Sequence, residues 1–163
     1  PLLFGAISYH MIGLNEDPSR FAVFLITLVL INLSAASACF VFSGATSDVG
    51  KANLYASLFF VFNVLFGGLL ITARSPVVRF LMRLSLFNYG YQTLMANEFQ
   101  GRTDLIFDPK DAGVAVGMTG ELWLVNIGVD VKNEPNMVTT NIAVLLLAIL
   151  ALLSLSAYLL SRR

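Results

Sequence analysis

Charged residues are scarce in this chain. Its 163 residues contain ten Lys and Arg and ten Asp and Glu, so the charged fraction is 12% and the formal net charge is zero. Soluble domains carry about 25% charged residues, roughly twice as many. Without a basic surplus the composition does not indicate nucleic-acid binding, and without an acidic tail it does not indicate a disordered arm.

Cysteine and histidine each occur once, which excludes most metal and nucleophilic chemistry. Cys39 lies in an apolar run and cannot form an intrachain disulfide, so we interpret it as a small packing residue. His10 alone cannot build a His-rich metal site or a His–Cys pair, and we expect it to be structural or interfacial. Residues 44–52 depart from a phosphate-binding loop, because five residues separate the two glycines and Ala52 follows Lys51. We expect no catalytic residue, metal or cofactor within this chain.

Hydrophobic residues make up 57% of the chain and lie in long uncharged runs. A bilayer core of roughly 30 Å needs about 20 apolar residues in a helix, and residues 21–44, 52–73 and 138–160 meet this length. Residues 1–14 are interpreted as the end of a further span. A helix satisfies its backbone hydrogen bonds within one segment, and the runs lack the polar alternation of a barrel. We therefore predict an all-α integral membrane protein, a polytopic helical bundle.

The predicted spans contain no Asp, Glu, Lys or Arg. Proton-coupled and ion-coupled transporters usually keep ionisable residues in the membrane, and voltage sensors need arginines there. Both mechanisms are therefore disfavoured. The remaining Asn and Ser residues are expected to act in packing and hydrogen bonding, and Ser34 and Ala38, four positions apart, permit close helix contact.

The connections between the runs differ in length. Before the first full run, Asp17 or Ser19 is expected to cap the helix. Residues 46–51 are a short connection, which predicts an antiparallel hairpin of the helices on either side. The long connection begins with the amphipathic residues 77–99, a segment expected to lie in the membrane interface or dip partly into the membrane. Residues 100–120, rich in Gly, Asp and Thr, are expected to form an irregular exposed loop.

Basic residues give an ambiguous orientation. Lys51 and the pair 162–163 favour a cytoplasmic hairpin loop and C-terminus. By the positive-inside rule, basic residues are enriched in cytoplasmic loops. The basic residues of the long connection would reverse this orientation if they were counted, although the rule applies mainly to short loops.

Four stretches carry a family resemblance, and they occur in the family's order. They are ISYHMIGL (7–14), SAASACFVF (34–42), FNVLFGGLLI (62–71) and LSLFNYGYQTLMANEFQG (84–101). Together they resemble the second half of the membrane domain of the G subfamily of ATP-binding cassette (ABC) exporters, which includes the White-like half-transporters. The ending AYLLSRR (157–163) is similar to the family's sixth helix and its basic stop.

The resemblance implies the layout of the chain, a partial ABC-2-type transmembrane domain over residues 1–163. Its parts would be the end of the third helix (1–14), the fourth (21–44), the fifth (52–73), a re-entrant helical pair (77–99), the last extracellular loop (100–137) and the sixth helix (138–160). The C-terminus would be cytoplasmic. The last loop lacks the cysteines that several members have, so disulfide linkage of protomers through this loop is excluded.

The resemblance also implies the site residues. In the family the fifth helices line a central substrate cavity, closed on the outer side by a Leu-Leu valve, which Leu69 and Leu70 match. Below the valve, Ser57, Val61 and Val64 are spaced i, i+4, i+7 on one helical face. Phe60 adjoins this face. An apolar cavity with one hydroxyl suits a lipid, sterol or other hydrophobic substrate.

The implied partners are a second transporter half, in a homodimer or heterodimer, and the lipid bilayer. A nucleotide-binding domain that uses ATP and Mg²⁺ would precede residue 1 in the same chain. No nucleic acid is expected as a partner. The expected location is a multi-pass position in the plasma membrane, which is preferred over an internal membrane.

Two alternatives remain open from the sequence. One is another ABC-2 permease, such as a glycan or lipid-linked glycan exporter, with its ATPase on a separate chain. The other is a membrane anchor or scaffold without transport activity. A membrane enzyme is disfavoured, because the sequence shows no His, Asp and Glu cluster. For Asn97 and Glu98 we expect a structural cap or a salt bridge to Arg102 rather than a functional role.

Overall fold

The computed structural model describes residues 1–163 except 16, 72–74, 104, 108–115, 130–135 and 163. The described elements are α1 (Leu2–Ile12), α2 (Pro18–Ala45), α3 (Val49–Leu65), α4 (Pro76–Leu84), α5 (Leu86–Phe99), β1 (Leu105–Phe107), β2 (Val116–Met118), α6 (Gly120–Asn126) and α7 (Met137–Ser161). Helices dominate, and the predicted helical membrane bundle is confirmed. Of the described helices, α2 and α7 are long and apolar enough to cross a membrane.

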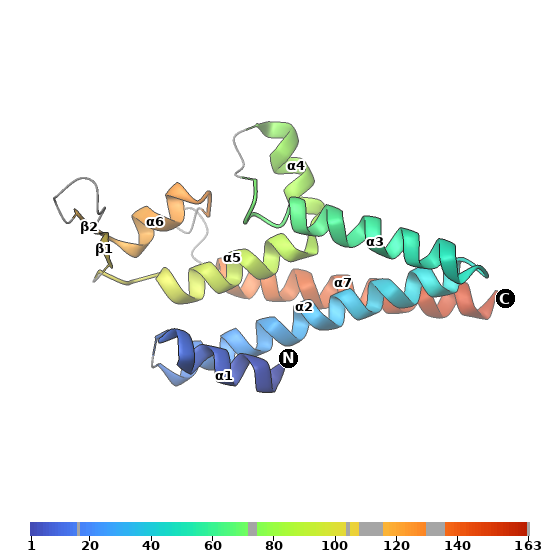
Figure 1. The fold of residues 1–163 in the computed structure, drawn as a ribbon, viewed down its shortest axis with the longest axis horizontal. Helices are drawn as coiled ribbons and strands as arrows, with labels where there is room; N and C mark the ends of the chain where they lie inside the picture. The colour runs from blue at the N-terminus through green and yellow to red at the C-terminus, as the bar shows by residue number, and fades with distance from the viewer. Residues whose placement is uncertain (16, 72–74, 104, 108–115, 130–135, 163) are drawn as a thin grey trace.

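The helices α2 and α7 lie side by side along the long axis of the molecule and form its scaffold (Figure 1). Leu30 of α2 packs with Leu145 and Ile149 of α7 in a buried cluster. Ser34 and Ala38 of α2 are fully buried, as close helix contact requires. The Ser34 hydroxyl donates to the Ile31 carbonyl oxygen (2.8 Å), so its donor needs no partner from another helix.

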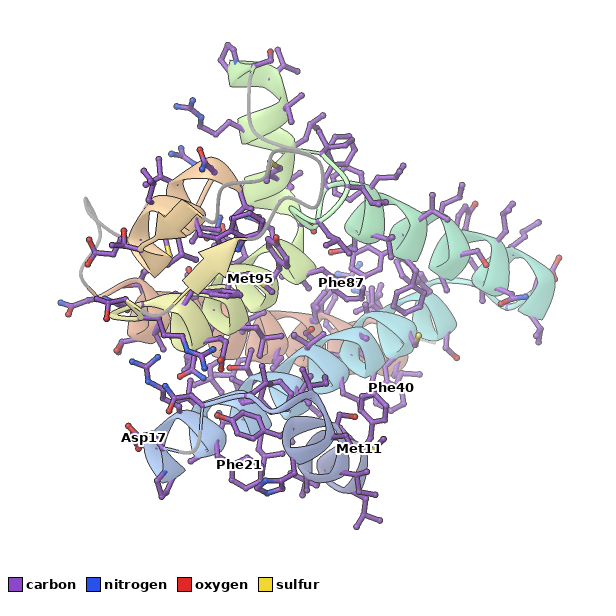
Figure 2. All side chains as sticks on the ribbon, turned by 60° about the vertical axis from the view of Figure 1, so that its left-hand side comes forward. Met11, Asp17, Phe21, Phe40, Phe87 and Met95 are labelled. Atoms are coloured by element: carbon purple, nitrogen blue, oxygen red, sulfur yellow. The ribbon has the colours of Figure 1, made fainter. Side chains whose placement is uncertain are left out.

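Large apolar side chains cover the outside of the bundle. Met11 and Phe40 are exposed and project from its edge in Figure 2, and Leu147 and Leu150 of α7 are exposed as well. Soluble monomers rarely leave such extensive apolar surface open to water. The exposed apolar surface therefore supports the membrane location.

Two aspartates cap helices at their N-termini. The Asp17 carboxylate accepts the Ser19 N–H at the start of α2 (3.0 Å), which confirms one of the two predicted caps. This hydrogen bond, with a second from the Ser19 hydroxyl, lowers the pKa of the Asp17 carboxyl. The Asp48 carboxylate likewise accepts the Gly50 N–H at the start of α3 (2.8 Å). The short connection between α2 and α3 gives the predicted antiparallel hairpin (Figure 1).

Helix α3 is shorter than the apolar run 52–73. It ends at Leu65, and residues 66–71 form turns and bends. Gly68 has φ +94°, a left-handed conformation that glycine adopts without strain. The chain thus leaves the helix after Leu65 and turns at Gly68, within a run that hydropathy alone cannot divide.

The amphipathic segment 77–99 forms two helices, α4 and α5, separated at Ser85. Helix α5 packs against α2 and α7, and Gly90 permits the approach because a Cβ there would clash with the Ile31 side chain. The depth of this pair in the bilayer stays a prediction.

Residues 100–120 are not irregular throughout, which corrects the expectation of a simple loop. Strands β1 and β2 pair antiparallel with Leu105 opposite Met118, and α6 follows. Leu124 of α6 and Val129 are buried against Ala96 of α5 and Met137 of α7. Backbone pairing thus orders part of residues 100–120, although their composition indicates a loop, and the apolar contact holds α6 and Val129 after it.

A candidate substrate path along α3

Asn63 determines how α3 is rotated against the rest of the bundle. Its side chain is fully buried, and it is the one residue of α3 that the described structure buries. Its side-chain oxygen accepts the Leu86 N–H (2.9 Å), and its amide nitrogen donates to the Phe59 carbonyl oxygen (2.9 Å). The buried Ser85 hydroxyl lies 3.1 Å from the Asn63 carbonyl oxygen and donates to it. Asn63 thereby joins the end of α3 to the start of α5.

The face of α3 opposite Asn63 is apolar and uncovered. Successive residues of a helix are about 100° apart, so Val61 lies nearly opposite Asn63, and Ser57 and Val64 lie beside Val61 on the same side of the helix. The exposed fractions of Val61 and Val64 are 56% and 50%, and Ser57 is exposed too. Phe60 lies at the edge of the face, half-buried, with its ring 5.7 Å from that of Phe59. Three of the four predicted cavity residues therefore share one open surface.

The Ser57 hydroxyl has limited capacity toward a ligand. It donates to the Asn53 carbonyl oxygen one turn earlier (2.8 Å). A hydroxyl has one donor and two acceptor sites, so the acceptor sites remain available to a ligand. The open face of α3 thus offers apolar area and one hydrogen-bond acceptor.

Leu69 and Leu70 are not on α3, although the sequence placed both within the run 52–73. They follow the turn at Gly68, and their exposed fractions are 74% and 61%. A Cβ at Gly68 would lie 2.9 Å from the Tyr91 ring, which shows how closely the turn passes α5. The two leucines therefore project from a non-helical segment at the end of the open face.

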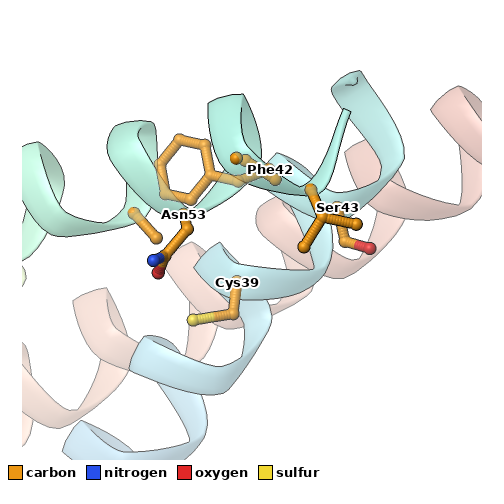
Figure 3. Close-up of a pocket in the computed structure, with 8 residues that line it drawn as sticks. Cys39, Phe42, Ser43 and Asn53 are labelled. Carbon is orange, nitrogen blue, oxygen red and sulfur yellow. The ribbon is translucent and has the colours of Figure 1, made fainter. Parts of the chain in front are cut away.

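A second surface feature lies at the other end of α3. A mostly apolar groove of about 380 Å³ separates α2 from α3 near the hairpin (Figure 3). Cys39, Phe42 and Ser43 line it from α2, and Asn53 lines it from α3. Among the described residues that line this groove there is no predicted cavity or valve residue. The groove and the open face are thus different surfaces.

The segment Asn97–Gly101 ties the end of α5 to the start of α2. The Arg20 guanidinium donates to the carbonyl oxygens of Asn97 (2.7 Å) and Gln100 (2.8 Å), and the Asn97 amide donates back to the Arg20 carbonyl oxygen (2.9 Å). Glu98 forms a salt bridge with Arg102, which confirms the structural role expected for it. Arg20 is not among the predicted site residues. The sequence signal for Arg20 is its position as a charged residue beside a long uncharged run. Its partners could not be inferred, because they lie 77 to 80 positions away in the sequence.

Comparison with known proteins identifies the family of this chain. The profile of the family described as ABC-2 type transporter matches residues 1–99, which include every predicted cavity and valve residue. The chain belongs to this ABC-2 family. The match extends from α1 through α5, and the resemblance to G-subfamily exporters is confirmed by the relatives.

Three relatives of this ABC-2 chain show the range of sequence identity and coverage. The broad substrate specificity ATP-binding cassette transporter ABCG2 of Bos taurus is 30% identical over 168 residues, 96% of this chain and 26% of the relative. ABC transporter G family member 24 of Dictyostelium discoideum is 38% identical over 62% of this chain and 9% of the relative. ABC transporter G family member 7 of Arabidopsis thaliana is 38% identical over 62% of this chain and 14% of the relative. The ABC-2 chain thus spans about a quarter of the bovine relative.

Proposed function

We propose that this chain forms part of the translocation path of an ATP-driven ABC exporter for a lipid, sterol or other hydrophobic substrate. The main support for this proposal is the open face of α3. Asn63 fixes its own side of the helix against the bundle, and Val61 and Val64 remain exposed. An apolar surface with one acceptor binds by shape and burial rather than by charge pairing. Leu69 and Leu70, at the end of this face, would close the path as an extracellular valve.

The proposed transporter is a dimer in which the open faces of two membrane halves enclose the cavity. The halves would be identical or different chains. The protein would be multi-pass in the plasma membrane, with the C-terminus and the α2–α3 hairpin in the cytoplasm. Substrate would pass when the two halves change from an inward-open to an outward-open arrangement.

ATP and Mg²⁺ would bind a nucleotide-binding domain that precedes residue 1. The Gly50–Lys51 pair of this chain does not fit a nucleotide, because the Asp48 carboxylate already accepts the Gly50 N–H (2.8 Å). A carboxylate at this helix start would also repel a phosphate. This chain's own residues would bind substrate, exclude water and open the valve.

The proposal predicts that V61W in the full transporter lowers transport of a fluorescent lipid or hydrophobic drug into proteoliposomes. A tryptophan there would fill the path, and we expect a loss of about tenfold, the effect of roughly 1.4 kcal/mol on an equilibrium. L147W is the matched control, since Leu147 is exposed and apolar on α7. Lipid can accommodate a larger side chain at that position.

Equal transport by V61W and the wild type would contradict the path, and equal losses in V61W and L147W would assign the effect to packing. The anchor alternative predicts that V61W and substitutions at Leu69 and Leu70 all leave function intact, whereas changes in residues 100–137 abolish it.

Sequencing the transcript upstream of residue 1 tests the ATPase arrangement independently. We expect an in-frame G-x-x-x-x-G-K-[ST] loop in a nucleotide-binding domain, followed by two further spans. This expectation agrees with the small share of the bovine relative that the chain covers, 26%. An upstream sequence without such a domain would contradict the single-chain exporter and favour a permease with a separate ATPase.

A further inference from the structure

Helix α4 runs across the bundle instead of along it. In Figure 1 the helices α2, α3 and α7 follow the long axis while α4 stands across it, and Figure 2 shows the same relation from another side. If α2 and α7 cross the bilayer, α4 is therefore oriented close to the plane of the membrane. This orientation is typical of interfacial amphipathic helices.

The position of α4 along the bundle places it near one membrane boundary. Helix α3 has 17 residues, and a rise of about 1.5 Å per residue gives a length of roughly 26 Å. The hydrocarbon core of a bilayer is about 30 Å thick. With the α2–α3 hairpin at one boundary, α4 follows the other end of α3 and lies close to the opposite boundary.

The side chains of α4 divide into three sectors around the helix. Met82 is buried, and Val78 beside it is half-buried, so this sector faces the protein. Val77, Phe80 and Leu84 are exposed, and the 100° step places them roughly opposite Met82. The helix thus presents an uncovered apolar sector directed away from the bundle.

The third sector of α4 is basic. Arg79 and Arg83, one turn apart and both exposed, lie between the buried and the apolar sectors. Neither forms an ion pair with a residue in the described part of the chain. Two neighbouring guanidinium groups beside an apolar strip complement a phospholipid, which has an anionic head group above its acyl chains.

We propose that α4 is a binding site for an anionic phospholipid, with Arg79 and Arg83 holding the head-group phosphate. Val77, Phe80 and Leu84 would contact the acyl chains. A guanidinium presents a rigid fork of donors that matches phosphate in a bidentate manner, and its long stem lets it extend from apolar depth to the head groups. The proposal rests on the membrane location of the chain and goes beyond its transported substrate.

The test uses the full transporter in lipid nanodiscs that contain phosphatidylglycerol and phosphatidylcholine. Native mass spectrometry of the released protein measures the preference for retained phosphatidylglycerol. We expect R79Q/R83Q to lower this preference by about tenfold, because the head-group phosphate loses its charge-assisted hydrogen bonds to the guanidinium groups. K51Q/R162Q is the matched control, because it removes two exposed basic groups at the other end of the bundle.

R79K/R83K retains both charges but loses the guanidinium fork, so its preference should lie between those of the wild type and R79Q/R83Q. This comparison holds whatever the stability of the glutamine variant. The wild-type preference should also fall at high salt, since salt screens exposed charges. An unchanged preference in R79Q/R83Q, or an equal loss in K51Q/R162Q, would overturn the proposal. Competition by inorganic phosphate at constant ionic strength would also overturn it, because a free anion and not a lipid would then be the ligand. These results do not depend on transport, so failure of the proposed function would be seen separately.

Discussion

Replacing Arg20 with methionine should release the end of α5 from the start of α2. The guanidinium group donates to three carbonyl oxygens, those of Asn97, Glu98 and Gln100. Carbonyl groups at a helix C-terminus have no partner within the helix, and a cation there is favourable. Hydrogen bonds to charged groups contribute about 1.5–3 kcal/mol each. Because water partly replaces these hydrogen bonds in R20M, we expect the free energy of unfolding to fall by roughly 3 kcal/mol.

Hydrogen exchange of the solubilised transporter would measure this effect locally. In R20M the amides near the end of α5 should exchange faster, while those in the middle of α7 should keep their protection. R20K should be intermediate, because an ammonium group cannot contact all the carbonyl oxygens in the same geometry. R162M is the control for loss of charge. If R20M leaves exchange at residues 97–102 unchanged, Arg20 does not hold this end of the bundle.

Replacing Asn63 with leucine should have a comparable effect at the other end of α5. The side chain would lose its acceptor for the Leu86 N–H, which starts α5 next to the buried Ser85. A buried donor without a partner costs about 1–3 kcal/mol. Because the same residue fixes the rotation of α3, N63L should also reduce transport.

N53L is the matched control, because Asn53 is an exposed asparagine on the same helix and its carbonyl oxygen, which accepts the Ser57 hydroxyl, is unchanged. Surface substitutions usually change stability by less than about 0.5 kcal/mol. Thermal unfolding of the solubilised transporter should show a clear loss for N63L and almost none for N53L. Similar unfolding temperatures for the two variants would show that the buried network does not stabilise the joint between α3 and α5.

Local patterns predicted part of the candidate site. The spacing of Ser57, Val61 and Val64 places them on one helical face, and the structure brings them together. The direction of that face could not be read from spacing, because it depends on Asn63 and its partners at the start of α5. Leu69 and Leu70 show the same limit, since both lie in an apolar run but follow the turn at Gly68.

The sequence by itself determined that this is a helical membrane protein and where its long helices lie. Apolar runs without charge and the helical period are local properties, and a bilayer selects them without reference to other segments. Only the tertiary structure decided where α3 ends, how it is rotated and how the described parts of residues 100–120 fold. Those outcomes depend on contacts between distant residues, such as Asn63 with Ser85, 22 positions apart, and Arg20 with Asn97, 77 positions apart. A hydrogen bond of that kind forms only after the fold has brought its two groups together.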